Sequence, residues 1–181
     1  MDKQTFRKAC LKRLRRSAKH PNHYGKDKKI SQKLAKILEK EKPRTILFYL
    51  PLDLEVDLKM LMLRMKKKCK ILVPFIVEES FKMVEYRLPL EKNSFGIFEP
   101  KADNLAQKNI DLIIVPIVGM DKHRQRVGFG KGMYDRFYEK LSPKPVVVFV
   151  QRDGCTSREK LCDSYDIRCH YYLTSKETII N

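Results

Sequence analysis

The stretch DLIIVPIVGMD, residues 111–121, is the most apolar part of the chain. Its first half has no polar residue between Leu112 and Pro116, which is typical of a strand buried on both faces of a sheet. Three shorter runs have the same character, namely TILFYL (45–50), KILVPF (70–75) and PVVVFV (145–150). Four such runs separated by longer segments predict a sheet whose strands are mainly parallel.

The segments around these strands have helical periodicity. Residues 2–19 place Phe6, Cys10, Leu11, Leu14 and Ala18 on one stripe and predict a basic helix. HPNHYGK (20–26) predicts a break, and further helices are expected at 28–42, 55–68 and 131–141, with strands at 81–88 and 171–173. The sequence therefore predicts an α/β fold with helices on both faces of the sheet, a single domain over residues 1–181, and a basic helical N-terminal arm at about 1–42.

The charge is strongly positive and unevenly distributed. The net charge is +17, and residues 1–44 alone contain sixteen Lys/Arg against four Asp/Glu. This balance suits polyanions such as nucleotides, phosphorylated metabolites, folate polyglutamates or nucleic acid, although a solvated surface would have the same composition. The chain shows neither an apolar run of bilayer-spanning length nor the apolar core of a secretory signal, so a cytoplasmic protein without membrane contact is expected.

The five cysteines are widely spread. Their odd number and their positions favour reduced thiols over a disulfide framework. Three of them recur every seven residues before His170, but zinc sites usually contain a tight cysteine pair, so we do not expect a zinc site. The cysteines are Cys10, Cys69, Cys155, Cys162 and Cys169.

Directly after the apolar stretch comes RVGFGKGMYDR (126–136), which holds three of the chain's seven glycines. Glycines permit positive φ angles and close approach, and the amides of such a loop, followed by a helix, favour phosphate. Lys131 and Arg126 could cover charge on a phosphoryl group, and Asp135 is either a magnesium ligand or a first-turn aspartate. The spacing is neither a Walker loop nor a dinucleotide fingerprint, and a glycine-rich turn without a ligand remains an alternative.

These residues resemble the signature of the 5-formyltetrahydrofolate cyclo-ligase family, also called 5,10-methenyltetrahydrofolate synthetases. KQTFR, near the N-terminus, resembles the family's opening motif, and LPLDLEVD (50–57) resembles the segment that brings a glutamate to the folate. FGIFEP (95–100) resembles a further stretch lining the cleft, so the likeness covers nearly the whole chain. The signature positions are Arg126, Gly128, Gly130, Lys131, Gly132, Tyr134 and Asp135.

The resemblance implies an ATP- and magnesium-dependent enzyme that converts 5-formyltetrahydrofolate to 5,10-methenyltetrahydrofolate, ADP and phosphate. It implies catalytic roles for Lys131, Arg126 and Tyr134. It assigns the folate to Glu55, with Asp57 as a weaker candidate, and to Tyr134, and assigns magnesium to Asp135; a monomer is expected. The ATP-binding residues that it implies are Lys3, Arg7, Arg126, Gly128, Phe129, Gly130, Lys131, Gly132, Met133 and Tyr134.

The sequence departs from the family pattern in two places. Met133 stands where the first tyrosine of a pair is usual, and DIRCH offers Asp166 but His170 where a second aspartate is expected. Histidine suits magnesium less well than oxygen ligands do. Two other functions stay open at this point: a basic nucleic-acid-binding module using KACLKRLRRSAKH (8–20), and a different α/β protein whose loop grips a phosphorylated substrate.

Overall fold

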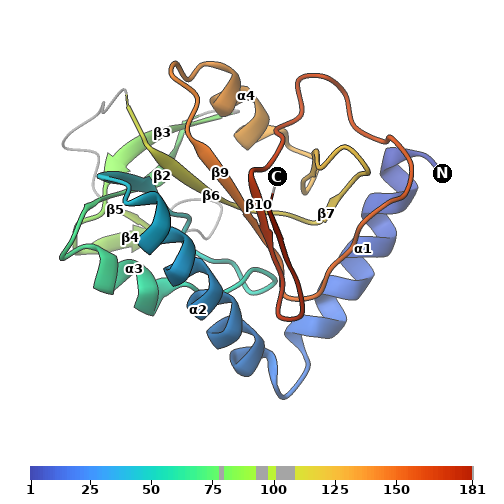
Figure 1. Ribbon diagram of the computed structural model, residues 1–181, viewed down its shortest axis with the longest axis horizontal. Coiled ribbons are helices and arrows are strands. Elements are labelled where there is room, and N and C mark those ends of the chain that lie inside the picture. The colour runs from blue at the N-terminus through green and yellow to red at the C-terminus, as the bar shows by residue number, and fades with distance from the viewer. Residues whose placement is uncertain (78–79, 93–97, 101–108, 181) are drawn as a thin grey trace.

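A seven-stranded sheet lies at the centre of the computed structural model, which describes residues 1–77, 80–92, 98–100 and 109–180. Within that part of the chain the strand order is β11-β10-β9-β6-β1-β2-β3 (Figure 1). The strands are β1 Thr45–Leu47, β2 Lys70–Val77, β3 Ser80–Glu85, β6 Leu112–Pro116, β9 Val146–Val150, β10 Tyr171–Leu173 and β11 Thr178–Ile180. Two small two-stranded sheets are formed by β4 Leu90–Lys92 with β5 Phe98–Pro100, and by β7 Gly119–Met120 with β8 Arg126–Val127.

The five inner strands are parallel. β1 pairs in parallel with β2 and β6, β6 pairs with β9, and β9 pairs with β10. The edge strands β3 and β11 are antiparallel to their neighbours. The prediction of a mainly parallel sheet is therefore confirmed, and the apolar runs at 45–50, 70–75, 111–121 and 145–150 each supply one of its strands.

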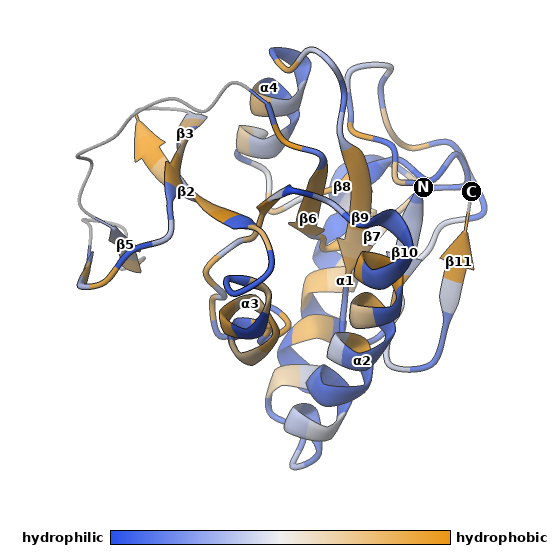
Figure 2. Ribbon diagram, turned by 60° about the vertical axis from the view of Figure 1, so that its left-hand side comes forward, coloured by the Kyte–Doolittle hydropathy of each residue, from blue (hydrophilic) through white to orange (hydrophobic). Residues whose placement is uncertain are grey.

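Helices cover both faces, as predicted. On one face α2 (His23–Glu41) and α3 (Lys59–Met65) pack against alternate strand residues, so that Ile30, Leu34 and Leu61 share a buried cluster with Ile46 and Ile114. On the other face α4 (Met133–Glu139) buries Phe137 with a second cluster of strand residues. Figure 2 shows the central strands as the most hydrophobic part of the chain, with polar residues on the outer sides of α1 and α2.

Helix α1 (Lys3–Ala18) lies apart from α2, beside β7 (Figure 1). It begins at Asp2, whose side chain accepts hydrogen bonds from the backbone N–H groups of Gln4 and Thr5, both at 2.9 Å. Its apolar stripe is buried against Val118 and Val127 in a small third cluster. Helix α1 carries Lys3 and Arg7, which the resemblance assigns to ATP binding.

The expectation of reduced thiols is wrong for two cysteines. Cys10 of α1 is disulfide-bonded to Cys155, which follows β9. The two residues are 145 positions apart in the sequence, and only the packing of α1 over the β9 end brings them together. Within the described residues Cys69, Cys162 and Cys169 are not disulfide-bonded.

Several boundaries differ from the sequence-based prediction. The break at 20–26 is narrower, because α2 begins at His23 and contains Gly25. The stretch 111–121 does not form one strand, since β6 ends at Pro116 and Gly119–Met120 pairs with β8 instead. Strand β11 was not predicted, and of FGIFEP only residues 98–100, in β5, fall within the described residues. No helix in the described part of the chain is both long and apolar enough to cross a bilayer.

Candidate functional site

The glycine loop connects β8 with α4, and each of its glycines has a physical reason. Gly130 and Gly132 have φ angles of 113° and 60°, which side chains disfavour. Gly128 has an ordinary φ but no space, because an added Cβ would lie 2.4 Å from Arg126 Nη1. Phe129 and Lys131, between the glycines, are exposed. The loop therefore presents backbone and two exposed side chains in a shape that other residues would not permit.

Arg126 is the buried centre of this region. Its side chain is 5% exposed, and its Nη1 donates to Asp135 Oδ2 at 3.0 Å. The guanidinium carbon lies 5.1 Å from the centre of the Tyr134 ring, close enough for a cation–π contact. The other oxygen of Asp135 accepts the backbone N–H of Ile167 at 3.2 Å. Arg126 thus links the glycine loop, the first turn of α4 and the segment before β10.

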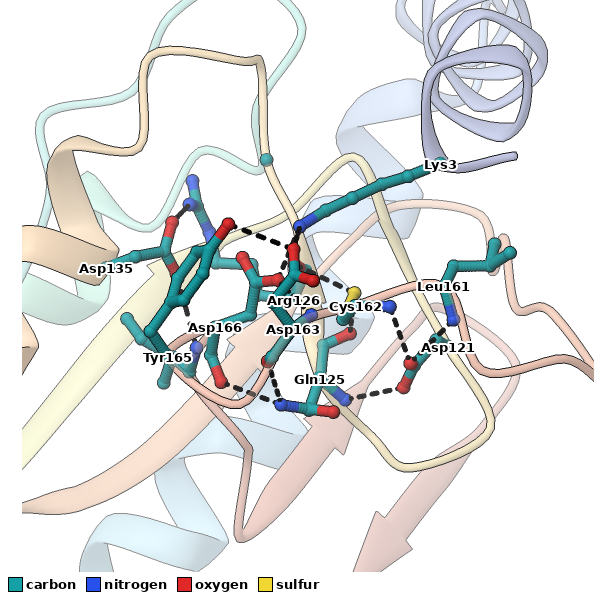
Figure 3. A network of polar contacts seen from close by, with 12 residues as sticks. Lys3, Asp121, Gln125, Arg126, Asp135, Leu161, Cys162, Asp163, Tyr165 and Asp166 are labelled. Carbon is teal, nitrogen blue, oxygen red and sulfur yellow. Dashed lines mark hydrogen bonds and ion pairs between the residues drawn. The ribbon is translucent and has the colours of Figure 1, made fainter.

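Helix α1 brings two cations to the same region. Arg7 Nε donates to the carbonyl oxygen of Gly128 at 2.9 Å, across 121 residues of sequence. Lys3 Nζ pairs with the buried Asp166 and lies 3.6 Å from Asp163 Oδ2 (Figure 3). Burial disfavours the Lys3 ammonium, but the Asp166 carboxylate outweighs it, so the pKa of Lys3 is raised. Lys3 is therefore a charged side chain held against the loop that precedes β10.

The carboxylate of Asp121 accepts backbone N–H groups from two segments of the chain. Its Oδ1 accepts the N–H groups of His123 and Gln125, and its Oδ2 accepts those of Leu161 and Cys162. Burial disfavours the charged carboxylate, but the four N–H groups together lower the pKa of Asp121. Figure 3 shows this carboxylate tying the turn before β8 to the chain at Leu161 and Cys162.

Glu55 lies in the segment between β1 and α3. Its Oε2 accepts the N–H of Leu52 at 2.9 Å, and its own N–H donates to the Leu52 carbonyl at 2.8 Å. Burial raises the pKa of Glu55 to about 7, even though Arg126 and Arg152 favour the charged form. Burial also raises the pKa of Tyr134, with the Glu55 charge adding to the effect. The structure thus places Glu55 within electrostatic reach of Arg126 and Tyr134.

The other residues predicted from the sequence make packing contacts or hydrogen bonds. Met133 and Tyr134 open α4 and pack partly against the second core cluster. The exposed Asp57 accepts the N–H of Lys59 at 2.8 Å, which is a local turn contact. His170, also exposed, accepts the N–H of Val147 at its Nδ1 at 3.0 Å, so that this nitrogen is already bonded.

The described residues contain no cluster of three or more His, Cys, Asp or Glu side chains that could hold a metal by themselves. Asp135 accepts one hydrogen bond on each carboxylate oxygen, from Arg126 and from Ile167. Each carboxylate oxygen has a second lone pair, so each oxygen of Asp135 can accept one further contact. Asp166 and His170 both border a hollow of about 800 Å³.

Three buried residues near Glu55 were not identified from the sequence. Tyr49 donates its hydroxyl to the carbonyl of Val56 at 2.6 Å, and Asp27 and Arg152 form an ion pair beside the same segment. Tyr49 falls inside an apolar run and Asp27 inside a basic helix, so neither has a local signal. Only the folded chain brings these residues together.

The chain is similar to known proteins of one family. A family model described as "5-formyltetrahydrofolate cyclo-ligase family" matches residues 1–154. A 5-formyltetrahydrofolate cyclo-ligase of Mycoplasma pneumoniae is 31% identical over 174 residues, which cover 93% of this chain and 95% of that protein. A cyclo-ligase of the same name from Haemophilus influenzae is 26% identical over 161 residues, 83% of this chain and 86% of its own length.

Solved structures show the same fold. The 5,10-methenyltetrahydrofolate synthetase of Aquifex aeolicus superimposes with a TM-score of 0.81 at 25% identity, covering 99% of this chain and 93% of that one. The corresponding synthetase of Mycoplasma pneumoniae gives a TM-score of 0.75 at 24% identity over 95% and 98% of the two chains. These comparisons do not support the nucleic-acid-binding alternative. The resemblance first seen at the glycine loop is confirmed, and the chain belongs to the 5-formyltetrahydrofolate cyclo-ligase family of enzymes.

Proposed function

We propose that this enzyme converts 5-formyltetrahydrofolate and ATP to 5,10-methenyltetrahydrofolate, ADP and phosphate. The formyl oxygen attacks the terminal phosphorus of ATP, and ADP leaves. The neighbouring folate nitrogen then attacks the activated formyl carbon and loses its proton, and phosphate leaves with the former formyl oxygen. Phosphorylation turns an amide-like, unreactive carbon into one with a good leaving group.

The observation that carries this proposal is the hydrogen bond from Arg7 of α1 to the Gly128 carbonyl. Because of this contact, the cations of the N-terminal helix and the amides of the glycine loop face one region, although they are far apart in sequence. Such a region suits the phosphates of a nucleotide, since phosphoryl transfer depends mostly on positioning and charge stabilisation. The family membership supports ATP as the substrate held there.

The side chains around the loop divide the work. We assign the exposed Lys131 to the transferred phosphoryl group, as a mobile cation. Arg126, held by Asp135, is a fixed positive charge behind the loop, and it lies against the Tyr134 ring. Lys3, Arg7 and the backbone of residues 128–134, with Phe129 and Met133, complete the proposed ATP site. Charge that develops during transfer is thus met by groups that are already in place.

The folate site is proposed around Glu55 and Tyr134. With a pKa raised to about 7, Glu55 changes protonation in the neutral range. As a carboxylate it accepts hydrogen bonds from the pterin N–H groups, which compensate for its burial. Tyr134 borders both proposed sites. Its ring lies against Arg126, and the charge of Glu55 adds to the burial that raises the pKa of its hydroxyl.

Magnesium is assigned to Asp135. The donor set fits this ion, which is usually held by one or two carboxylates together with substrate phosphates. When bound, the ion would neutralise charge on the phosphates. Arg126, which shares the Asp135 carboxylate, would keep that carboxylate oriented.

The direct test is spectroscopic. Mixing the protein with 5-formyltetrahydrofolate, ATP and magnesium should produce the near-ultraviolet absorbance of the methenyl product. Reactions without ATP, or with chelator in excess of magnesium, are the controls and should stay flat. A flat trace in the complete mixture would overturn the proposed function. Three further expectations stay predictions: one domain over residues 1–181, a monomer, and a cytoplasmic location.

A further inference from the structure

A buried ion pair lies behind the segment that carries Glu55. Arg152, just after β9, donates from Nε to Asp27 Oδ1 at 2.7 Å and from its Nη2 to Asp27 Oδ2 at 2.9 Å. Each residue is 4% exposed, and Asp27 belongs to the first turns of α2. This bidentate geometry fixes the orientation of both side chains.

The same pair holds the segment between β1 and α3 at two points. Arg152 Nη1 donates to the carbonyl oxygen of Asp53 at 3.1 Å, and Asp27 Oδ2 accepts the backbone N–H of Asp57 at 3.0 Å. Glu55 lies midway between these two anchored residues. Its carboxylate is thereby confined to a short turn whose two ends are both attached to one rigid ion pair.

We propose that Arg152 and Asp27 are positioning residues for the folate site, which fix the 53–57 segment so that the Glu55 carboxylate meets the pterin. This inference rests on the proposed function. The pair belongs neither to the glycine loop nor to the N-terminal cations. It would control how tightly and in which orientation the reduced folate binds, while the glycine loop would bind the nucleotide.

Arg152 also acts on Glu55 electrostatically. Burial raises the pKa of Glu55, while the positive charges of Arg126, from β8, and Arg152 oppose that rise. Tyr49, after β1, and Tyr134, on α4, face the same carboxylate as neutral hydroxyls with raised pKa values. Loss of the Arg152 charge should therefore leave Glu55 protonated to a higher pH.

A purely structural role is the competing explanation, because removing one partner of a buried ion pair is strongly destabilising. Replacing both partners by apolar residues of similar size is often tolerated by the fold. The double variant Asp27→Leu/Arg152→Met therefore keeps the packing and removes the two anchors. A second apolar pair, Asp27→Met/Arg152→Leu, removes the same two anchors and serves if the first double variant does not fold.

The chain offers a matched control one residue away from each partner. Lys26 and Asp153 form an ion pair at 2.6 Å between the same two parts of the fold, α2 and the chain after β9. In the structure their side chains bond to each other and Lys26 also to Ser17, outside the 53–57 segment. The variant Lys26→Met/Asp153→Asn therefore removes a neighbouring bridge and leaves both anchors of the Glu55 turn.

The experiment measures binding of 5-formyltetrahydrofolate and of ATP separately by titration calorimetry, followed by kcat and KM. In the double variant we expect folate affinity to fall at least tenfold, ATP affinity to change less than twofold, and the acid limb of the kcat/KM profile to move to higher pH. The control variant should match the wild type in all three. Adding Glu55→Gln to the double variant should weaken folate binding little further, because the anchors act through Glu55.

The outcomes distinguish a failure of the positioning role from a failure of the proposed function. Unchanged folate affinity in either folded double variant of Asp27 and Arg152 would overturn the positioning role while the wild type still made the methenyl product. Equal losses of folate and ATP affinity would also overturn it, because they indicate general loosening. A wild-type chain that binds no 5-formyltetrahydrofolate would overturn the proposed function and this inference with it.

Discussion

Gly128 is the residue at which the loop depends most directly on a neighbouring side chain. In Gly128→Ala the new methyl group would lie 2.4–2.7 Å from the three terminal guanidinium atoms of Arg126. Arg126 must then move, which weakens its contacts with Asp135 and Tyr134. We expect turnover to fall at least tenfold with a loss of about 1 kcal/mol in unfolding free energy, measured by the absorbance assay and by urea denaturation.

Gly154→Ala is the matched control. There the closest atom to an added Cβ is the Tyr172 hydroxyl at 3.3 Å, which lies at the far end of a side chain. The φ angle of Gly154 is not in the left-handed region. Turnover in this variant should stay within twofold of the wild type. Equal activity in the two alanine variants would contradict the crowding argument at Gly128.

Lys131 tests the assignment of the phosphoryl group. Its side chain is exposed at the loop tip, so Lys131→Ala should leave the melting temperature nearly unchanged. We expect kcat to fall at least a hundredfold, because a charge that meets the transferred phosphoryl group is lost. Steady-state kinetics with both substrates saturating, alongside thermal melting, measures this, and wild-type kcat would place the phosphoryl group elsewhere.

Glu55 makes stability depend on pH in a direction opposite to that of a surface carboxylate. Its pKa is about 7 in the folded chain against 4.5 for the ordinary group, so the folded state keeps a proton that the unfolded state loses. The stability contributed by this proton declines as pH rises from about 4.5 to about 7, and the deficit is constant above that range. Glu55→Gln removes the deficit but also removes the carboxylate that we propose to bind the pterin.

We therefore expect Glu55→Gln to match the wild type in urea unfolding near pH 4 and to exceed it by about 2 kcal/mol at pH 8. Its affinity for 5-formyltetrahydrofolate should fall at least tenfold. If Glu55→Gln were less stable than the wild type at pH 8, the charged Glu55 carboxylate would not be destabilised by its burial. In that case the raised pKa would not describe this site.

The sequence contains the residues of the loop in an interpretable order, and the family signature identifies them. Arg152, Asp27 and Tyr49 are different, because their roles follow from contacts such as the 125-residue span between Asp27 and Arg152. Asp27 lies in a basic helix and Tyr49 in an apolar run, so neither residue is marked by its local sequence. Burial and long-range pairing, which decide both roles, are not visible in local composition.

At the scale of elements, α1 is predicted as a helix, and the family resemblance assigns its Lys3 and Arg7 to ATP, but the sequence does not show which surface the helix packs against. Its interaction with the loop is tested by Arg7→Ala, which removes the hydrogen bond to Gly128. We expect KM for ATP to rise about tenfold, with the folate KM nearly unchanged, in steady-state kinetics. Lys8→Ala, an exposed neighbour on the same helix, is the control, and an equal effect in both variants would indicate a diffuse charge effect instead.

The elements themselves follow the sequence where burial is continuous. The four apolar runs became four parallel strands because both faces of the inner sheet are covered by helices. The stretch 111–121 was predicted too long, since after Pro116 the chain leaves the sheet and pairs with β8. Apolar residues on both sides of that exit are buried, so hydrophobicity alone does not mark it.

At the scale of the whole molecule, the Cys10–Cys155 disulfide joins regions near the two ends of the chain. Denatured without reductant, the protein should present three thiols to a thiol reagent, and five after reduction. Cys10→Ser/Cys155→Ser should lose about 3 kcal/mol of unfolding free energy, because a loop of this length is no longer closed in the unfolded chain. Five thiols in the unreduced protein would show that the bond does not form.

Other contacts also join the two ends of the chain. The N-terminal amine pairs with Glu159 at 2.7 Å, and Lys3 pairs with Asp166. The neighbouring Ile167 N–H in turn holds Asp135. Synthesis on the ribosome therefore makes Lys3 and Arg7 long before their partners Asp166 and Gly128. Helix α1 can pack against Val118 and Val127 once these have emerged, but nascent chains that stop short of residue 167 should still lack a working nucleotide site even when the central strands have already formed.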